Sequence, residues 1–279
     1  MDGRYDKYGN MIESAYFDTD GEPVRDKEGV MKVEAVYNNK GYISSISYVD
    51  AGGNLVPNKI GIAQVTITYD NNNNLEKISF KDADGAPCPI ANVRLEYDES
   101  GNQTGQFVSC LEDKLFQPAG FNWRAKYDKG NLVEKVYLNN VKEPYLNPNE
   151  GYAKYIAKYN ERGRLIELSF FDTEEKPCLN NKGYAKVSYG YDEWGNVTEI
   201  LFLGVDGKPC TDSSGVARCV MRYDERGNKI EEATSDTEGT PCLNAQGAAK
   251  MTAVCDSWGN VTEMTYWGTD GRLGLNKEG

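Results

Sequence analysis

Apolar and polar residues alternate along most of the chain with a period of two. In the segment 183–204, one predicted face carries Ala185, Val187, Tyr189, Tyr191, Thr198, Ile200 and Phe202. The residues between them are mostly polar. Side chains of a β-strand point to alternate faces, so this period predicts strands and not helices. A fold about Trp194-Gly195 pairs Tyr191 with Thr198, Tyr189 with Ile200 and Val187 with Phe202 in a β-hairpin.

The same hairpin recurs about nine times along the chain. The consensus of the copies is Y-[DN]-x-x-G-[NR], and successive anchor residues lie 28 to 32 positions apart. The anchors are Tyr5, Tyr37, Tyr69, Tyr97, Tyr127, Tyr159, Tyr191, Tyr223 and Cys255. A glycine such as Gly195 closes each turn, with Asn73 in the third copy. Both residue types tolerate a positive φ, which a tight hairpin turn requires.

The repeats predict an all-β fold. A single hairpin is marginal in water, so we expect tandem β-hairpins to stack into an elongated or coiled antiparallel sheet of roughly 18 strands, of solenoid or shell type. We predict one repeat domain over residues 1–279, with irregular units near 97–126. The chain begins inside a repeat and ends where a strand should begin, so we expect it to be a segment of a longer protein.

Composition narrows the possible functions. The net charge is −12, which disfavours nucleic acid as a partner, and no apolar run is long enough for membrane insertion. The chain has no histidine, which removes histidine bases and most zinc sites. We expect no enzyme, no cofactor and no metal. No secretory signal is visible, and both the cytoplasm and the cell surface are compatible with the sequence.

Three recurrent residue types could carry chemistry. Cys88, Cys178, Cys210 and Cys242 share one repeat position, where thiol packing is favoured over metal or redox chemistry. The D-x-D-G loops at Asp18 and Asp82 could bind Ca²⁺, but turn formation explains them better.

A glutamate also recurs on the return strand, at Glu13, Glu134, Glu167, Glu199, Glu231 and Glu263. Basic residues lie on the same predicted face, at Lys32, Lys154, Lys186, Arg218 and Lys250. Cross-strand charge pairing is favoured over a carboxylate hydrolase, because an active site is normally singular and this residue is repeated.

Aromatic residues are the candidate binding residues. Tyr8, Trp194 and Trp258 occupy equivalent turn tips, and Trp267 lies on a late strand. Phe116, Phe121 and Trp123 belong to the irregular stretch. Such rings could stack on a sugar or anchor a protein, and the alternative is packing between neighbouring turns. A protein or glycan partner is therefore expected.

The motifs YDESGN (97–102), YDEWGN (191–196) and YDERGN (223–228) resemble the RHS/YD repeats of bacterial surface and toxin-delivery proteins. The resemblance implies β-hairpins wound into a hollow shell, without catalytic residues of their own. The unit here is longer, because loops such as KPCLNNKGYAK extend it. We therefore expect a non-catalytic interaction module. The alternative is a structural stalk or encapsulating shell that contacts other domains of the same full-length chain.

Overall fold

The computed structural model describes residues 2–110 and 122–274, which form β-strands joined by turns. The strands are β1 (Asp2–Tyr5), β2 (Met11–Ala15), β3 (Lys32–Tyr37), β4 (Ile43–Val49), β5 (Gln64–Tyr69), β6 (Leu75–Lys81), β7 (Pro87–Tyr97), β8 (Gln103–Cys110), β9 (Asn122–Asp128), β10 (Asn131–Leu138), β11 (Lys154–Tyr159), β12 (Leu165–Phe171), β13 (Lys186–Tyr191), β14 (Val197–Leu203), β15 (Arg218–Tyr223), β16 (Lys229–Ser235), β17 (Lys250–Cys255), β18 (Val261–Trp267) and β19 (Leu273–Gly274). The described residues contain no helix that is long and apolar enough to cross a membrane.

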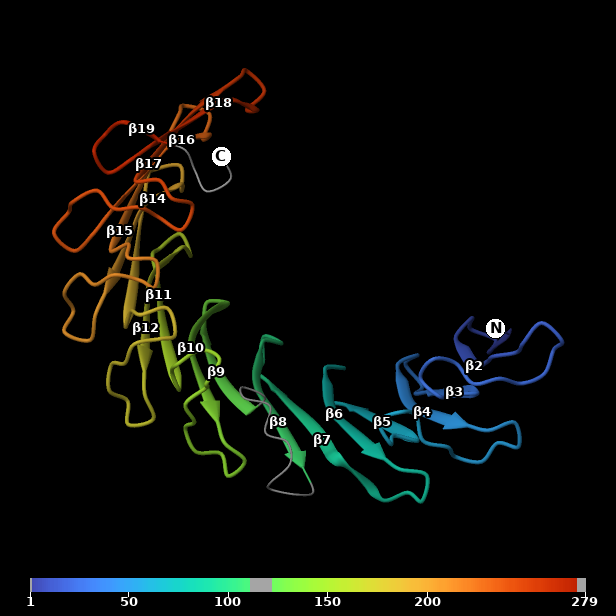
Figure 1. The fold of residues 1–279 in the computed structure, drawn as a ribbon. Coiled ribbons are helices and arrows are strands. Elements are labelled where there is room, and N and C mark those ends of the chain that lie inside the picture. Colours follow the sequence, from blue (N-terminus) through green and yellow to red (C-terminus); the bar gives the residue numbers. More distant parts are fainter. Residues whose placement is uncertain (1, 111–121, 275–279) are drawn as a thin grey trace. The chain divides into compact units, whose positions relative to one another are not determined.

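The strands pair in chain order. β13 pairs with β14 as a hairpin, and β14 then pairs with β15 of the next hairpin, both antiparallel. The same alternation holds elsewhere, and Figure 1 shows the strands following one another in sequence. Contacts between described strands join only strands that are consecutive in the chain. This arrangement confirms the predicted all-β fold of tandem β-hairpins.

The predicted register is correct for two of the three pairs. Val187 lies opposite Phe202 and Tyr189 lies opposite Ile200, but Tyr191 lies opposite Val197 and not Thr198. A register shift falls between Gly190 and Tyr191, so one extra residue separates the pairs on the return strand. A bulge of this kind commonly accompanies a turn that ends in a left-handed residue. The same shift precedes the anchor in other hairpins, for example between Arg222 and Tyr223.

The contacts divide the chain into two compact units. The first comprises Met1–Arg124 with Asn140–Lys142, and the second comprises Ala125–Asn139 with Glu143–Gly279. β9 begins in the first unit and ends in the second. The single repeat domain expected over residues 1–279 stays a prediction.

The buried residues of the second unit come mainly from the two positions directly before the first strand of each hairpin and from that strand itself. Ala153, Ala185, Ala217 and Ala249 are at most 3% exposed. Beside them the rings of Tyr152, Phe170, Tyr184 and Phe202 form a continuous row, with successive ring centroids 4.7, 5.9 and 4.5 Å apart. Offset aromatic pairs at these distances add to the stabilisation from area burial. In the first unit, Val30, Val49 and Ala63 are buried at comparable places.

Candidate functional site

The acidic loops are hydrogen-bonded turns. Asp224 Oδ1 accepts the backbone N–H of Arg226 and of Asn228, each at 2.9 Å, and Asn228 Nδ2 donates to Asp224 Oδ2 at 2.9 Å. The Asn228 side-chain bond, together with the backbone bonds, holds the pKa of Asp224 below its ordinary value. The carboxylate thus satisfies donors that the turn would leave unpaired.

The loops that could have bound Ca²⁺ form the same turn. Asp18 Oδ1 accepts the backbone N–H of Asp20 and of Glu22, each at 2.9 Å. Asp82 Oδ1 accepts those of Asp84 and Ala86 at 3.1 and 2.8 Å. These hydrogen bonds support the turn interpretation of both loops. Within residues 2–110 and 122–274, no group of three or more His, Cys, Asp or Glu side chains could hold a metal ion.

Five of the six recurrent glutamates form ion pairs with a neighbouring unit, and Glu263 forms none with the described residues. Glu167 Oε1 lies 2.8 Å from Lys158 Nζ of its own hairpin, and its Oε2 lies 3.2 Å from Lys186 Nζ of the next. Burial alone would raise the pKa of Glu167, but the two lysines outweigh burial and hold it below its ordinary value. An ionised carboxylate with two cations is a poor general acid.

The other predicted bases form equivalent pairs with the preceding unit. Lys32 contacts Glu13 at 3.3 Å, Lys154 contacts Glu134 at 3.4 Å, Arg218 contacts Glu199 at 2.5 Å and Lys250 contacts Glu231 at 2.7 Å.

The anchor tyrosines also join successive units. The hydroxyl of Tyr191 donates to the backbone carbonyl of Leu165 at 2.7 Å, in the preceding hairpin. Tyr37, Tyr69, Tyr159 and Tyr223 make the same bond over 2.9 to 3.0 Å. The sequence shows the tyrosine but not its distant acceptor, so this role was not predicted.

The cysteines at the shared repeat position are thiols packed against backbone. The Sγ atoms of Cys88, Cys178 and Cys210 lie 3.6, 3.9 and 3.8 Å from the carbonyl oxygens of Gly61, Gly151 and Gly183. Burial raises the pKa of each thiol. The cysteine side chains that the structure describes are all free. A buried, protonated thiol behaves as a small apolar side chain.

Turn tips of the second unit carry a row in which arginine and tryptophan alternate. Arg162, Trp194, Arg226 and Trp258 occupy equivalent positions in four consecutive hairpins. Trp194 and Trp258 are 72% and 86% exposed. One hairpin lies between them, so they are two hairpin steps apart, or about 19 Å at the usual strand spacing.

The arginines of this turn-tip row fix each turn to the next. Arg162 Nη1 donates to the Glu193 carbonyl at 2.7 Å, and Arg226 Nη1 donates to the Ser257 carbonyl at 2.6 Å. Arg164 donates to the Trp194 carbonyl at 3.0 Å, and its guanidinium fills the space where a Cβ of Gly195 would lie. The tryptophan backbones are therefore held while their rings face solvent.

The other predicted binding residues lie elsewhere. Tyr8 is a turn tip of the first unit and is 77% exposed. Trp123 is half-buried on β9, and Trp267 is half-buried on β18, where its Nε1 donates to Thr252 Oγ1 at 3.3 Å. Phe116 and Phe121 lie outside the described residues. The five described candidates therefore lie on separate turns and strands of two units, and their role in binding stays a prediction.

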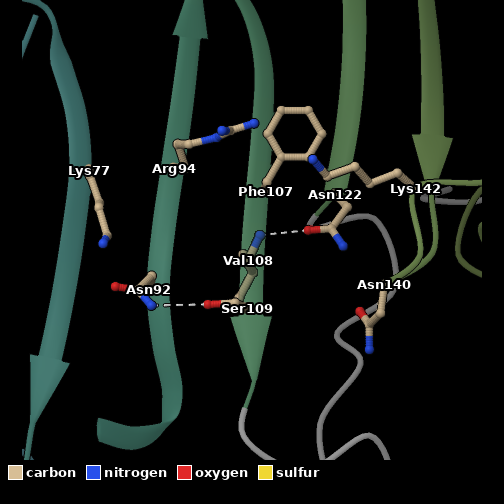
Figure 2. A pocket seen from close by; sticks show the side chains of 9 residues that line it. All are labelled: Lys77, Asn92, Arg94, Phe107, Val108, Ser109, Asn122, Asn140 and Lys142. Carbon is tan, nitrogen blue, oxygen red and sulfur yellow. Dashed lines mark hydrogen bonds between the residues drawn. The ribbon is translucent and has the colours of Figure 1, made fainter.

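A polar pocket in the first unit was missed from the sequence. Lys77, Arg94 and Lys142 line it together with Phe107 (Figure 2). These residues come from separate strands and a loop of irregular units, where the repeat spacing gives no guide to their neighbours.

No model of a known protein family matches the sequence, and no curated protein matches it. Among solved structures, the fold is similar to a chain in the Photorhabdus luminescens Tc holotoxin pore with the mutation TccC3-D651A, with a TM-score of 0.53 and 14% identity. The match covers 97% of this chain and 13% of that chain. The crystal structure of TcdB2-TccC3-Cdc42 has a TM-score of 0.48 at 15% identity, and covers 97% of this chain and 13% of that one. The chain thus shares a fold with a stretch of a toxin component and spans about an eighth of its length.

Proposed function

We propose that this chain is a non-catalytic structural array, one section of the wall of a larger RHS-like protein. The observation that carries the proposal is the way in which recurrent polar groups are used. The Tyr191 hydroxyl binds the backbone of the preceding hairpin, and Glu167 binds a lysine of the following one. Groups that could have formed an active site instead join one repeat to the next.

Two similarities support a structural role like that of the repeat walls in toxin-delivery proteins. The YDEWGN-like motifs resemble RHS/YD repeats, and the fold is similar to part of a chain in the Tc holotoxin pore. In a solenoid-type array each unit contacts mainly its neighbours, so length is gained by adding units. The chain matches only 13% of the toxin chain, as expected for a section of a longer wall.

The coding sequence on both sides of this segment tests the proposal. We expect further Y-[DN]-x-x-G repeats in frame, and a distinct globular domain beyond them. A gene that encodes residues 1–279 alone would contradict a wall of a larger protein. Turnover by the purified chain in a broad hydrolase screen, abolished by Glu167→Gln, would contradict the non-catalytic part.

The turn-tip row favours a second function, the binding of a protein or glycan. Trp194 and Trp258 are exposed rings on fixed backbones, which lose little conformational freedom when they bind a partner. Their regular spacing suits a partner that is itself extended along the row of hairpins.

Glycan arrays and pull-downs with the wild-type chain and with the Trp194→Ala/Trp258→Ala double variant test this second function. We expect a ligand whose binding the double variant weakens at least about tenfold, by analogy with aromatic hot spots. Tyr5→Ala is the control, because it removes an exposed ring that is not among the predicted binding residues. An equal loss of binding in the control, or no loss of binding in the double variant, would count against ligand binding by the turn-tip tryptophans.

A further inference from the structure

The series of ion pairs that joins the recurrent glutamates to bases of the next hairpin is interrupted in the first unit. The position of Glu167 is occupied by Lys77 on β6 and by Gly105 on β8. The position of Lys186 is occupied by Asn92 on β7 and Asn122 on β9. The recurrent carboxylate has therefore been replaced by a cation or by no side chain, and the basic partners have become amides.

Register places Lys77, one of the replaced positions, beside Arg94 and Phe107. Lys77 lies opposite Arg94, and Arg94 lies opposite Phe107, so the three side chains are neighbours across β6, β7 and β8. The ring of Phe107 covers Gly105, where an added Cβ would lie 2.8 Å from the Phe107 ring. Absence of the glutamate side chain thus makes room for the ring, which is 8% exposed.

Three cations surround the ring of Phe107. The Arg94 and Arg124 guanidinium carbons lie 5.2 and 5.5 Å from its centroid, and Lys142 Nζ lies 5.1 Å from it. Figure 2 shows Arg94 and Lys142 approaching the ring from either side in that view. A ring face attracts cations, and it holds these side chains in place without neutralising them.

The pocket beside this ring is about 380 Å³ in volume, and none of the described residues that line it is acidic. Its charged lining residues are Lys77, Arg94 and Lys142, in a chain whose net charge is −12. Arg94 contacts Glu96 at 2.6 Å, outside the lining. Neither lysine forms an ion pair with a carboxylate of the described residues.

Lys142 is held in a strained conformation. Its φ is 66°, at a turn position that is glycine at Gly207 and Gly239 and a left-handed glutamate, with a φ of 63°, at Glu175. A left-handed backbone is unfavourable for a residue with a Cβ, and such strain often accompanies a functional site. A lysine is retained where glycine would fit the turn better, and its ammonium group faces the pocket.

We propose that this pocket binds a small organic oxyanion, namely a sugar acid or a sugar phosphate. Lys77, Arg94 and Lys142 would bind the carboxylate or phosphate oxygens. Asn140 and the hydroxyl of Ser109, which accepts a hydrogen bond from Asn92 Nδ2 at 3.2 Å, would bind the sugar hydroxyls. The volume is in the range of small-molecule sites. This site is independent of the structural role and of the turn-tip row.

Titration calorimetry on the whole chain with glucuronate, glucose 6-phosphate and neutral glucose tests the proposal. We expect at least one of the two anions to bind saturably and glucose not to bind, with affinity falling as salt rises. Lys142→Gly should weaken binding of that anion at least about fivefold. The same substitution should raise the melting temperature, because glycine relieves the left-handed strain.

Lys129→Gly is the matched control. Lys129 also has a positive φ, 49°, but lies in the β9–β10 turn and does not line the pocket. Its replacement removes the same charge and relieves the same kind of strain. Because Lys129 lies outside the pocket, anion binding should not change. Binding of glucuronate alone identifies a carboxylate ligand, and binding of glucose 6-phosphate alone a phosphate ligand. Equal binding of glucose, binding of neither anion, or an unchanged affinity in Lys142→Gly would overturn the proposal.

Discussion

The anchor tyrosine shows how a single residue can both define a repeat and connect it to the previous one. Tyr191 begins the turn of its own hairpin, while its hydroxyl donates to the Leu165 carbonyl 26 residues earlier. Tyr5, the first anchor, has no preceding hairpin among the described residues and is 60% exposed. The contribution of the anchor hydroxyl to stability therefore depends on whether a preceding hairpin offers a carbonyl acceptor.

Tyr191→Phe should lower the free energy of unfolding by about 1 kcal/mol, the usual net contribution of a hydrogen bond of this kind. The midpoint of urea unfolding, followed by tryptophan fluorescence, measures the loss. Tyr5→Phe makes the same chemical change where no such bond exists, and should leave the midpoint unchanged. Equal effects of the two substitutions would argue against a stabilising hydrogen bond between the anchor tyrosine and the preceding hairpin.

Asp224→Asn should reduce the sensitivity of the fold to acid. The pKa of Asp224 lies below its ordinary value of 3.8 in the folded chain. Its contribution to stability is therefore complete above that ordinary value and is lost as the pH falls through the lowered, folded-state pKa. Asparagine occupies the same turn position at Asn38 and Asn160 and keeps the oxygen acceptor without titrating.

Melting temperatures of wild type and Asp224→Asn between about pH 6 and pH 2 check this expectation. The melting temperatures of the two proteins should be nearly equal at the higher pH. At the lower pH, the melting temperature of the variant should have fallen less than that of wild type. Glu225→Gln is the control, since the Glu225 side chain forms no part of the turn. An identical acid profile for wild type and Asp224→Asn would show that the turn carboxylate does not contribute.

At the scale of the element, the period-two pattern was enough to place the hairpins. Gly195 and its equivalents have positive φ, and Asn73 has a φ of 69°, as the turn pattern predicted. The bulge beside Tyr191 was missed because binary patterning specifies faces. One extra residue near the start of the return strand leaves the pairs further from the turn unchanged.

The candidate sites were less accessible to sequence reasoning. Turn tips such as Trp194 could be located because they lie at a fixed distance from the anchor. The hydrogen bond from Arg162 to the following turn depends on how two hairpins meet, which the spacing does not specify. The approach of Lys142 to Phe107 joins residues 35 positions apart in irregular units, where the repeat no longer predicts neighbours.

Glu167→Gln tests the ion pairs that join adjacent hairpins. It removes contacts with both Lys158 and Lys186, and should lower the free energy of unfolding by about 1 kcal/mol at low salt and by less at high salt, because Lys158 is well exposed. Urea titrations at two salt concentrations measure the difference. Glu193→Gln removes an exposed turn carboxylate that forms no ion pair with the described residues, and should have no comparable effect. A loss independent of salt would point to packing rather than charge.

At the scale of the whole molecule, pairing between chain neighbours makes one repeat nearly equivalent to another. Deletion of residues 192–223 would join Tyr191 directly to Asp224, and the motif YDERGN would follow in register. The anchor, the turn and the return strand would all be preserved. Such an array is stabilised by its units and by their interfaces, and removal of one unit removes one of each.

The chain without residues 192–223 should therefore fold and unfold cooperatively, with a melting temperature within about 5 °C of wild type. A deletion of residues 192–207 is the matched control, because it removes the turn, β14 and the first part of the following loop but leaves β15 in place. That variant should lose cooperativity or aggregate. Circular dichroism melts compare them, and equal melts for both deletions would contradict the repeat as the folding unit.

Pairing between chain neighbours also determines how the array responds to mechanical force. Strands that contact only their sequence neighbours separate in order when the chain is pulled from its ends, because each hairpin can detach without disturbing those beyond it. Each detached repeat would release about 100 Å of extended chain. The tyrosine hydrogen bonds and the ion pairs between adjacent hairpins must break each time a hairpin detaches from the next one. The array would therefore lengthen in equal steps under tension, while the hairpins that have not yet detached stay folded.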